Sequence, residues 1–157
     1  MPVRYRCAVS PSASRCRLAR ACPHYLTGPR MSVQRFAADG GMTFSKSVAV
    51  AGQGTWIYLS GQVGLDDDGQ IVPGGTEAEA LKTFEHLIAA VTQAGGTAAD
   101  IIRITGYLTS LDDYAGYGAA RKKVFGDTLP ASTAVQVAGL LLGAHVEIDA
   151  VAFVPHS

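Results

Sequence analysis

Residues 145–154 read HVEIDAVAFV, and the alternation within this stretch decides the fold. Successive side chains of a β-strand point to opposite faces of a sheet. One face begins with the polar residues His145, Glu147 and Asp149 and ends with Val151 and Phe153. The residues between them are small or apolar and suit packing beneath helices: Val146, Ile148, Ala150 and Ala152. The stretch therefore predicts a sheet that helices cover on one face only.

The rest of the chain supplies the partners of this strand. Glycine-rich turns, periodic apolar residues and alternating segments mark the elements. We predict strands at 44–50, 55–64, 101–110, 132–137 and 145–154, and helices at 76–93 and about 112–125. The order ββαβαββ predicts an α+β domain, with a mixed or mainly antiparallel sheet and two helices on one face.

The uncovered face is predicted to be polar at one end and apolar at the other. Alternation assigns three residues of the third strand to it, namely Arg103, Thr105 and Tyr107. The same reasoning assigns three residues of the fourth strand, namely Ser132, Ala134 and Gln136. A mixed face of this kind is either solvated or a subunit interface that contains a pocket, and the interface is favoured.

Two local patterns in the helices carry further predictions. Thr76 followed by Glu79 has the spacing of a capping box, which would begin the first helix. Arg121, Lys122 and Lys123 lie late in the second helix, where cations complement the helix dipole. We interpret this basic run as a solvated face.

The charge distribution divides the chain into two parts. Residues 1–30 contain six arginines, all three cysteines and no acid, whereas residues 31–157 carry a net charge of −6. An acidic body disfavours nucleic acid as a partner, and no segment has the roughly 20 apolar residues of a membrane span. A body without cysteines favours a cytoplasmic protein that needs neither disulfides nor metal to fold.

The first 30 residues are interpreted as a basic N-terminal extension. They lack the continuous apolar core of a secretory signal, although their arginines and serines would also suit a transit peptide. A disordered tail or a translation start placed too far upstream is favoured, because Met31 opens a natural-looking start. The foldable domain is accordingly 31–157.

Four segments together resemble one family. They are SGQVG (60–64), AADIIRITGYLTSLDDYAGY (98–117), LPASTAVQV (129–137) and VEIDAVAFV (146–154). Their order and spacing resemble the reactive intermediate deaminase (Rid or YjgF) family over about residues 43–154. The resemblance implies a chorismate-mutase-like fold and a homotrimer with pockets at the subunit clefts. It also implies cofactor-free hydrolysis of imines or enamines of 2-amino acids to 2-keto acids and ammonia.

The resemblance transfers site roles residue by residue, and several positions depart from it. Ser60 and Gly61 match the pocket loop, and Glu147 matches the acid that positions the attacking water. At four pocket positions this chain differs from the family: it has Ser47 in place of a tyrosine, Gly118 in place of an asparagine, Ser132 in place of a carboxylate-binding arginine, and Ala134 in place of a frequent cysteine.

The serine at position 132 decides the expected substrate. A guanidinium binds a carboxylate through a planar fork, whereas a serine hydroxyl offers one uncharged donor. Without another cation, a carboxylate would meet Glu147 and Asp149 and be repelled. We therefore expect a divergent imine or enamine deaminase that acts on a substrate other than the usual 2-imino acids.

The sequence is also compatible with other interpretations. The chain could be a non-catalytic trimer that binds a small metabolite in the same cleft, and ribonuclease activity, reported for some relatives, is disfavoured by the acidic body. Arg103 could replace the lost cation or could pair with an acid. His145, Glu147 and Asp149 are spaced too widely along one strand to favour a metal site, so no metal is expected.

Overall fold

The computed structural model describes residues 32–156, so the prediction for residues 1–30 lies outside the described part. The chain forms an α+β fold, as predicted. Its strands are β1 (Ser32–Ala37), β2 (Ser45–Ala51), β3 (Gly54–Val63), β4 (Ile101–Leu108), β5 (Ala131–Gln136) and β6 (Val146–Pro155). Its helices are α1 (Gly75–Gln93) and α2 (Tyr114–Phe125), with short 3₁₀ turns at Ala98–Asp100, Leu111–Asp113 and Leu141–Gly143.

The predicted ββαβαββ order lacked one strand, β1 at the edge of the sheet. β1 pairs with β2 alone, antiparallel, with Val33 opposite Val50. An edge strand buries little of either face, so its sequence SVQRFA has no strict alternation that would reveal it.

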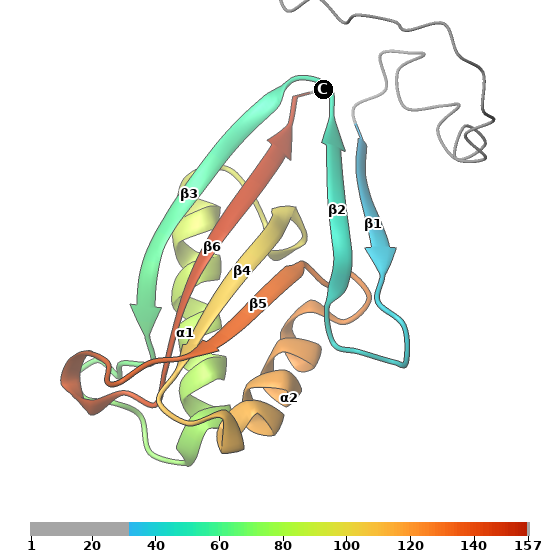
Figure 1. Cartoon of the computed structure of the whole chain (residues 1–157). Coiled ribbons are helices and arrows are strands. Elements are labelled where there is room, and N and C mark those ends of the chain that lie inside the picture. The colour runs from blue at the N-terminus through green and yellow to red at the C-terminus, as the bar shows by residue number, and fades with distance from the viewer. Residues whose placement is uncertain (1–31, 157) are drawn as a thin grey trace, which may run out of the picture.

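Six strands form one mixed sheet in the order β1-β2-β5-β4-β6-β3. β6 is antiparallel to both β3 and β4, and β5 is parallel to β4. The crossovers β3–α1–β4 and β4–α2–β5 proceed in the same direction along the sheet. Because such crossovers are right-handed, both helices lie on the same face, as Figure 1 shows.

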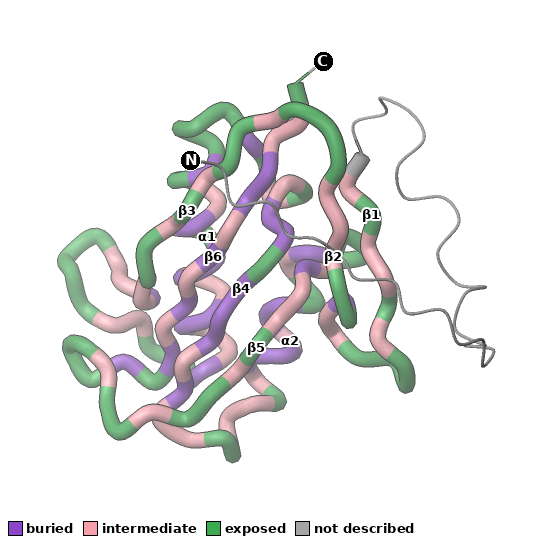
Figure 2. Tube along the Cα trace, turned by 45° about the horizontal axis from the view of Figure 1, so that its top comes forward, coloured by how far each residue is buried: buried purple, intermediate pink, exposed green. Residues whose placement is uncertain are grey.

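The core lies between the two helices and the centre of the sheet. Figure 2 shows the buried positions concentrated on β4, β6 and the helices, while β1 and β2 are only partly covered. Phe84 of α1 packs against Tyr117 and Phe125 of α2, with ring centroids 6.3 and 5.2 Å apart. Fourteen buried apolar residues form this cluster, which suits one domain of this size.

A glycine in the middle of β4 makes room for α2. A Cβ at Gly106 would lie 2.7 Å from Tyr117 Cζ, closer than two carbon atoms approach. The missing side chain therefore lets the Tyr117 ring lie directly on the strand.

The predicted capping box at the start of α1 was wrong. The helix begins after Gly74, which has a left-handed φ of 115°, and no side chain caps it. Thr76 is buried, and the side chain of Glu79 instead contacts His145, which precedes β6. A tertiary partner has taken the carboxylate that the local pattern assigned to the helix end.

The β1–β2 hairpin diverges from the rest of the sheet, as Figure 1 shows. β2 and β5 have one register pair, Ser45 with Ala131. Ser45 strengthens this junction, because its N–H donates to Pro130 O at 2.9 Å and its hydroxyl donates to Leu129 O at 2.5 Å.

Within residues 32–156, no helix has the length and apolar character that a membrane crossing would need.

Candidate functional site

Three of the predicted site residues meet on the uncovered face of the sheet. The pairing of β3 with β6 is irregular between Leu59 and Gln62, so Ser60 and Gly61 have no register partner. A Cβ on Gly61 would overlap the Glu147 carboxylate, which therefore lies against the Gly61 backbone. Ser60 and Gly61 are exposed and Glu147 is half-buried. The bulge thus exposes a glycine surface on which a carboxylate rests.

The neighbours of Glu147 on this face are polar. Tyr107 is its register partner on β4, and the Tyr107 hydroxyl donates to Asp149 Oδ2 at 2.9 Å. This hydrogen bond to a carboxylate raises the pKa of Tyr107. Among residues 32–156, neither Glu147 nor Arg103 takes part in an ion pair. The ion pair of Arg103 with an acid, one of the two roles considered from the sequence, is therefore absent from the described part of the chain.

Ser132 and Ala134 face the helices, and their predicted assignment to the uncovered face was wrong. Ser132 is in register with Ile104, and Ala134 with Gly106. Ile104 is fully buried beneath the helices. The strand carries small residues here because large side chains of α2 fill the space above them. Gln136 is in register with the buried Leu108, so it belongs to the same face of β5 as Ser132 and Ala134.

Arg121 of α2 fills that space, so its predicted position on a solvated face was wrong. It is 1% exposed. Its Nη1 donates to Ser132 Oγ at 2.7 Å. Its Nη2 and Nε donate to Thr43 Oγ1 at 2.6 and 3.2 Å, and Nη2 lies 3.4 Å from the Tyr114 hydroxyl. A cation therefore lies directly behind the serine that replaces the family's arginine.

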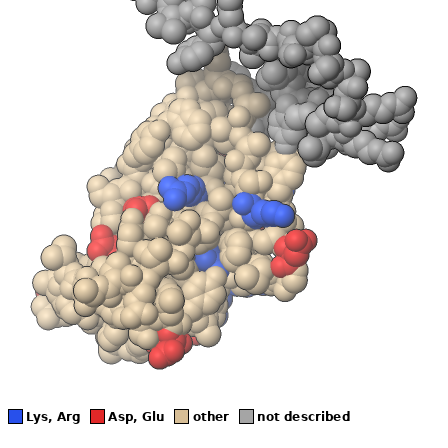
Figure 3. All heavy atoms as spheres, viewed as in Figure 1, with Lys and Arg blue, Asp and Glu red and all other residues tan. Residues whose placement is uncertain are grey.

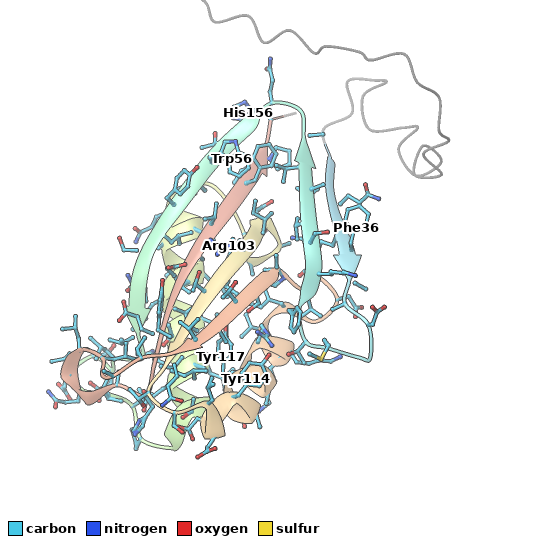
Figure 4. All side chains as sticks on the ribbon, in the orientation of Figure 1. Phe36, Trp56, Arg103, Tyr114, Tyr117 and His156 are labelled. Atoms are coloured by element: carbon cyan, nitrogen blue, oxygen red, sulfur yellow. The ribbon has the colours of Figure 1, made fainter. Side chains whose placement is uncertain are left out.

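Aromatic rings complete the surroundings of this guanidinium. Its Cζ lies 4.9 Å from the ring centroid of Tyr117, 5.3 Å from Phe44 and 5.8 Å from Tyr114. Such contacts stabilise a cation through the negative face of the ring. Burial raises the pKa of Tyr117, although hydrogen bonding to Ser132 and the charge of Arg121 act in the opposite direction. In Figure 4 Tyr114 and Tyr117 lie near one end of β5, away from Arg103 on β4.

The helical spacing contains the signal for a buried Arg121. Tyr114 and Tyr117 are aromatic residues suited to the inner face of this helix, and Arg121 follows them by seven and four residues. Residues at these spacings share one face of a helix. The arginine was assigned to solvent because it begins a basic run, but only Lys122 and Lys123 of that run are exposed.

Gly118 lies beside the same group. A Cβ there would lie 3.5 Å from Thr43 Oγ1 and 4.0 Å from Arg121 Nη2. Two of the predicted site positions, Ser132 and Gly118, thus border one cation. Ser47 does not join them in any described contact; it is exposed on β2, opposite Phe36 of β1.

His145 does not share a ligand face with Glu147 and Asp149. It precedes β6, where its Nδ1 lies 2.5 Å from Glu79 Oε1 and its N–H donates to Glu79 Oε2 at 2.8 Å. The hydrogen bond to Glu79 raises the pKa of His145. In the part of the chain that the structure describes, no three His, Cys, Asp or Glu side chains are grouped to hold a metal ion.

The surface itself gives two further observations. An open hollow of about 390 Å³ lies between α1 and the loop before it, and it includes none of the predicted site residues. Its lining residues are Asp66, Asp67, Val72, Ala78, Leu81, Lys82 and Glu85.

The sheet face in Figure 3 is mostly uncharged, with isolated basic and acidic groups rather than a basic patch.

Comparison with known proteins agrees with these motifs. The sequence model of the family described as endoribonuclease L-PSP matches residues 37–154. A mouse protein named 2-iminobutanoate/2-iminopropanoate deaminase is 40% identical over 97 residues, which cover 61% of this chain and 72% of the mouse protein. A RutC family protein of Pyrococcus abyssi is 30% identical over 111 residues, which cover 70% of this chain and 85% of that protein.

Solved structures give the same result. RidA from an Antarctic Psychrobacter is 32% identical with a TM-score of 0.61, and the match covers 80% of this chain and all of that chain (100%). Escherichia coli TdcF with bound serine is 29% identical with a TM-score of 0.60, covering 73% of this chain and 94% of that chain. The protein therefore belongs to the endoribonuclease L-PSP family, which is the Rid/YjgF family that its four sequence segments resemble.

Proposed function

We propose that this protein hydrolyses the C=N bond of an imine, or of the enamine in equilibrium with it, and releases ammonia. The observation that carries the proposal is the contact between the Glu147 carboxylate and the Gly61 backbone. It brings a proton acceptor to an exposed bulge, where a small planar substrate could lie against backbone. The names of relatives up to 40% identical support the same reaction class.

The chemistry requires one acceptor and one water molecule. Glu147 takes a proton from the water as its oxygen bonds to the imine carbon and the π electrons move to nitrogen. Glu147 returns this proton to nitrogen, which gives the neutral carbinolamine. Glu147 then takes the hydroxyl proton of the carbinolamine and passes it to nitrogen, so that the C–N bond breaks, ammonia leaves and the carbon becomes a carbonyl. The sum is C=N plus water giving C=O plus ammonia, so no cofactor is needed. Ser60 would hold the substrate beside the bulge through its exposed hydroxyl.

The complete site is proposed to form between copies of the chain in a homotrimer. Glu147 belongs to the uncovered face of the sheet, whereas Ser132 faces the helices. A small substrate that contacts both groups must therefore bind two copies. The uncovered face carries large exposed apolar side chains suited to burial, with Tyr58 78% exposed and Trp56 48% exposed.

The position of Arg121 changes which substrate the site is expected to accept. A substrate without a carboxylate was expected because Ser132 offers no charge. Arg121 Nη1, 2.7 Å from Ser132 Oγ, supplies a cation at that position and removes this reason. A carboxylate-bearing imine is therefore compatible with the site.

Ammonia release from 2-iminobutanoate, generated in situ by an amino-acid oxidase, tests the proposal. We expect a rate above uncatalysed hydrolysis, and a loss of about 100-fold or more in kcat for Glu147→Gln. Glu85→Gln is the matched control, because Glu85 is an exposed carboxylate on α1. A wild type that binds 2-oxobutanoate saturably but releases no ammonia would instead be the non-catalytic metabolite-binding protein.

A further inference from the structure

Arg121 is a buried cation for which the described part of the chain provides no anion. Its side chain is 1% exposed, and no ion pair within residues 32–156 includes it. Neutral hydroxyls and aromatic rings surround it instead. Removing a charge from water is costly, and an apolar side chain of similar volume is often equally stable or more stable there. Stability alone therefore does not account for an arginine at this position.

The two hydroxyls that accept from Arg121 each keep a hydrogen of their own to donate. Ser132 and Thr43 are half-buried, whereas the guanidinium behind them is covered. A hydroxyl that accepts a hydrogen bond keeps its own hydrogen to donate. Thr43 Oγ1 accepts from both Nε and Nη2, so its hydrogen points away from the arginine.

Ser132 has one more neighbour, and this neighbour is compatible with donation outward. The Tyr117 hydroxyl lies 3.5 Å from Ser132 Oγ, at the limit of a hydrogen bond. Burial raises the pKa of Tyr117, so the phenol keeps its proton and can act as the donor. Ser132 then accepts from Tyr117 and Arg121, and its own hydrogen is free for a third partner.

We propose that Arg121, acting through the hydroxyls of Ser132 and Thr43, takes over the anion-binding role of the arginine that Ser132 replaces, so that this chain holds a substrate carboxylate with a cation from α2. The two hydroxyls accept from different nitrogens of one guanidinium, and each offers one donor to a carboxylate. The positive charge behind them polarises both O–H groups and strengthens each bond. This inference rests on the proposed function in calling the bound carboxylate a substrate. Carboxylate binding itself can be measured without turnover.

The residue that carries the charge is not one of the residues that contact the ligand. Arg121 is a positioning residue, because the atoms that touch the ligand are Ser132 Oγ and Thr43 Oγ1. A charged hydrogen-bond network of this kind changes affinity by about 10- to 100-fold. We therefore expect its removal to raise KM for a carboxylate substrate by that factor while kcat changes much less.

The first test is a titration with 2-oxobutanoate, the carboxylate product, and with its neutral methyl ester. We expect the wild type to bind the carboxylate at least tenfold more tightly than the ester, and Arg121→Met to lose this difference. Lys122→Met is the matched control, since it removes an exposed cation from the same helical turn. Unchanged carboxylate binding by Arg121→Met would overturn the proposal, and so would equal binding of acid and ester by the wild type.

The second test exchanges the two residues and decides the question even if Arg121→Met does not fold. Ser132→Arg alone removes the hydroxyl that accepts from Arg121 and forces a second large side chain into the buried space beside it, so we expect it to lose carboxylate binding rather than gain it. The double variant Arg121→Ser with Ser132→Arg returns a single cation to the strand and should recover binding. If the double variant instead loses as much carboxylate binding energy as the two single variants lose together, the inference is contradicted.

Further outcomes separate this inference from its alternatives and from the proposed function. Carboxylate binding that depends on Arg121 but comes without ammonia release would support the inference and refute the deaminase. If Arg121→Met dissociates the oligomer and the wild type binds no 2-oxobutanoate, a carboxylate of a second copy is the anion and the inference fails. Equal competition by chloride at the same concentration would identify a general anion site and also overturn it.

Discussion

Glu79 of α1 binds both the backbone N–H and the imidazole of His145, at 2.8 and 2.5 Å, and so fixes the chain two residues before Glu147. The Glu79 side chain is 1% exposed, whereas that of His145 is 54% exposed. A buried carboxylate thus sets the position at which β6 begins, and through it the position of Glu147.

This contact predicts a pH dependence of stability. The pKa of His145 is raised by Glu79, so its contribution to the free energy of unfolding is complete below about pH 6.5 and is lost as the pH rises through the raised pKa. Because His145 is exposed, we expect a loss of no more than about 1 kcal/mol. Denaturant unfolding of the wild type and His145→Gln between pH 5 and about 9 measures it.

The control for this prediction is His86→Gln, which removes a different imidazole, one that lies on α1. It should keep the wild-type fall in stability with pH, whereas His145→Gln should flatten it. If both variants fall in stability as the wild type does, His145 is not the titrating group.

The Gly61–Glu147 contact predicts a separation of activity from stability. In Gly61→Ala the methyl group overlaps the carboxylate, so Glu147 must turn away from the bulge. We expect a large fall in kcat, on the order of 100-fold if Glu147 is the base, and a change in unfolding free energy of about 1 kcal/mol or less. Gly139→Ala is the control, because nothing lies within 4 Å of a Cβ there. Wild-type activity in Gly61→Ala would show that the carboxylate position is unimportant.

The Gly106–Tyr117 contact predicts the opposite outcome. Gly106→Ala adds a methyl group 2.7 Å from Tyr117 Cζ, in a core that cannot expand freely. We expect a loss of about 1–3 kcal/mol in unfolding free energy. Thermal or denaturant unfolding beside Gly139→Ala measures it, and equal stability of the two variants would mean that α2 shifts without cost.

The exposed Tyr58 side chain provides a test of whether the trimer assembles through the uncovered face of the sheet. Tyr58→Asp places a charge on a side chain that is 78% exposed in one chain and is proposed to be buried in the trimer. We expect the mass in solution, measured by light scattering, to fall toward that of one chain. Ala89→Asp on the outer surface of α1 should leave the mass unchanged. An unaltered mass for Tyr58→Asp would argue against assembly through this face.

The sequence predicts most of the fold because periodic patterns record burial directly. HVEIDAVAFV gives the correct face for Glu147, and the apolar spacing of 76–93 gives α1 to within one residue. The strand phase at Ser132 fails for a physical reason. Its small residues are what the large side chains of α2 require, and small polar residues equally suit a solvated face.

Arg121 could not be identified by composition for a similar reason. Arginine is rarely buried without an acid, so a basic run next to two exposed lysines is normally assigned to solvent. Only the position of Tyr114 and Tyr117 on the same helical face argues for the inside. The partners that stabilise it, Thr43 and Phe44, lie 78 and 77 residues earlier in the chain and cannot be inferred from local pattern.

The β1–β2 hairpin is joined to the rest of the molecule at two places, and the proposed ligand binds at one of them. At the other, Arg35 Nη2 donates to Ala99 O at 2.6 Å and to Ile101 O at 3.3 Å. The lower end of the hairpin is held by the bonds of Ser45 to Leu129 and Pro130 and by the bond of Thr43 to Arg121. Thr43 is therefore shared between hairpin docking and carboxylate binding. By linkage, a ligand that orders Thr43 must also tighten the hairpin, and a loosened hairpin must weaken the ligand by the same factor. Affinity could then be tuned from β1, a strand that touches neither the substrate nor the catalytic carboxylate.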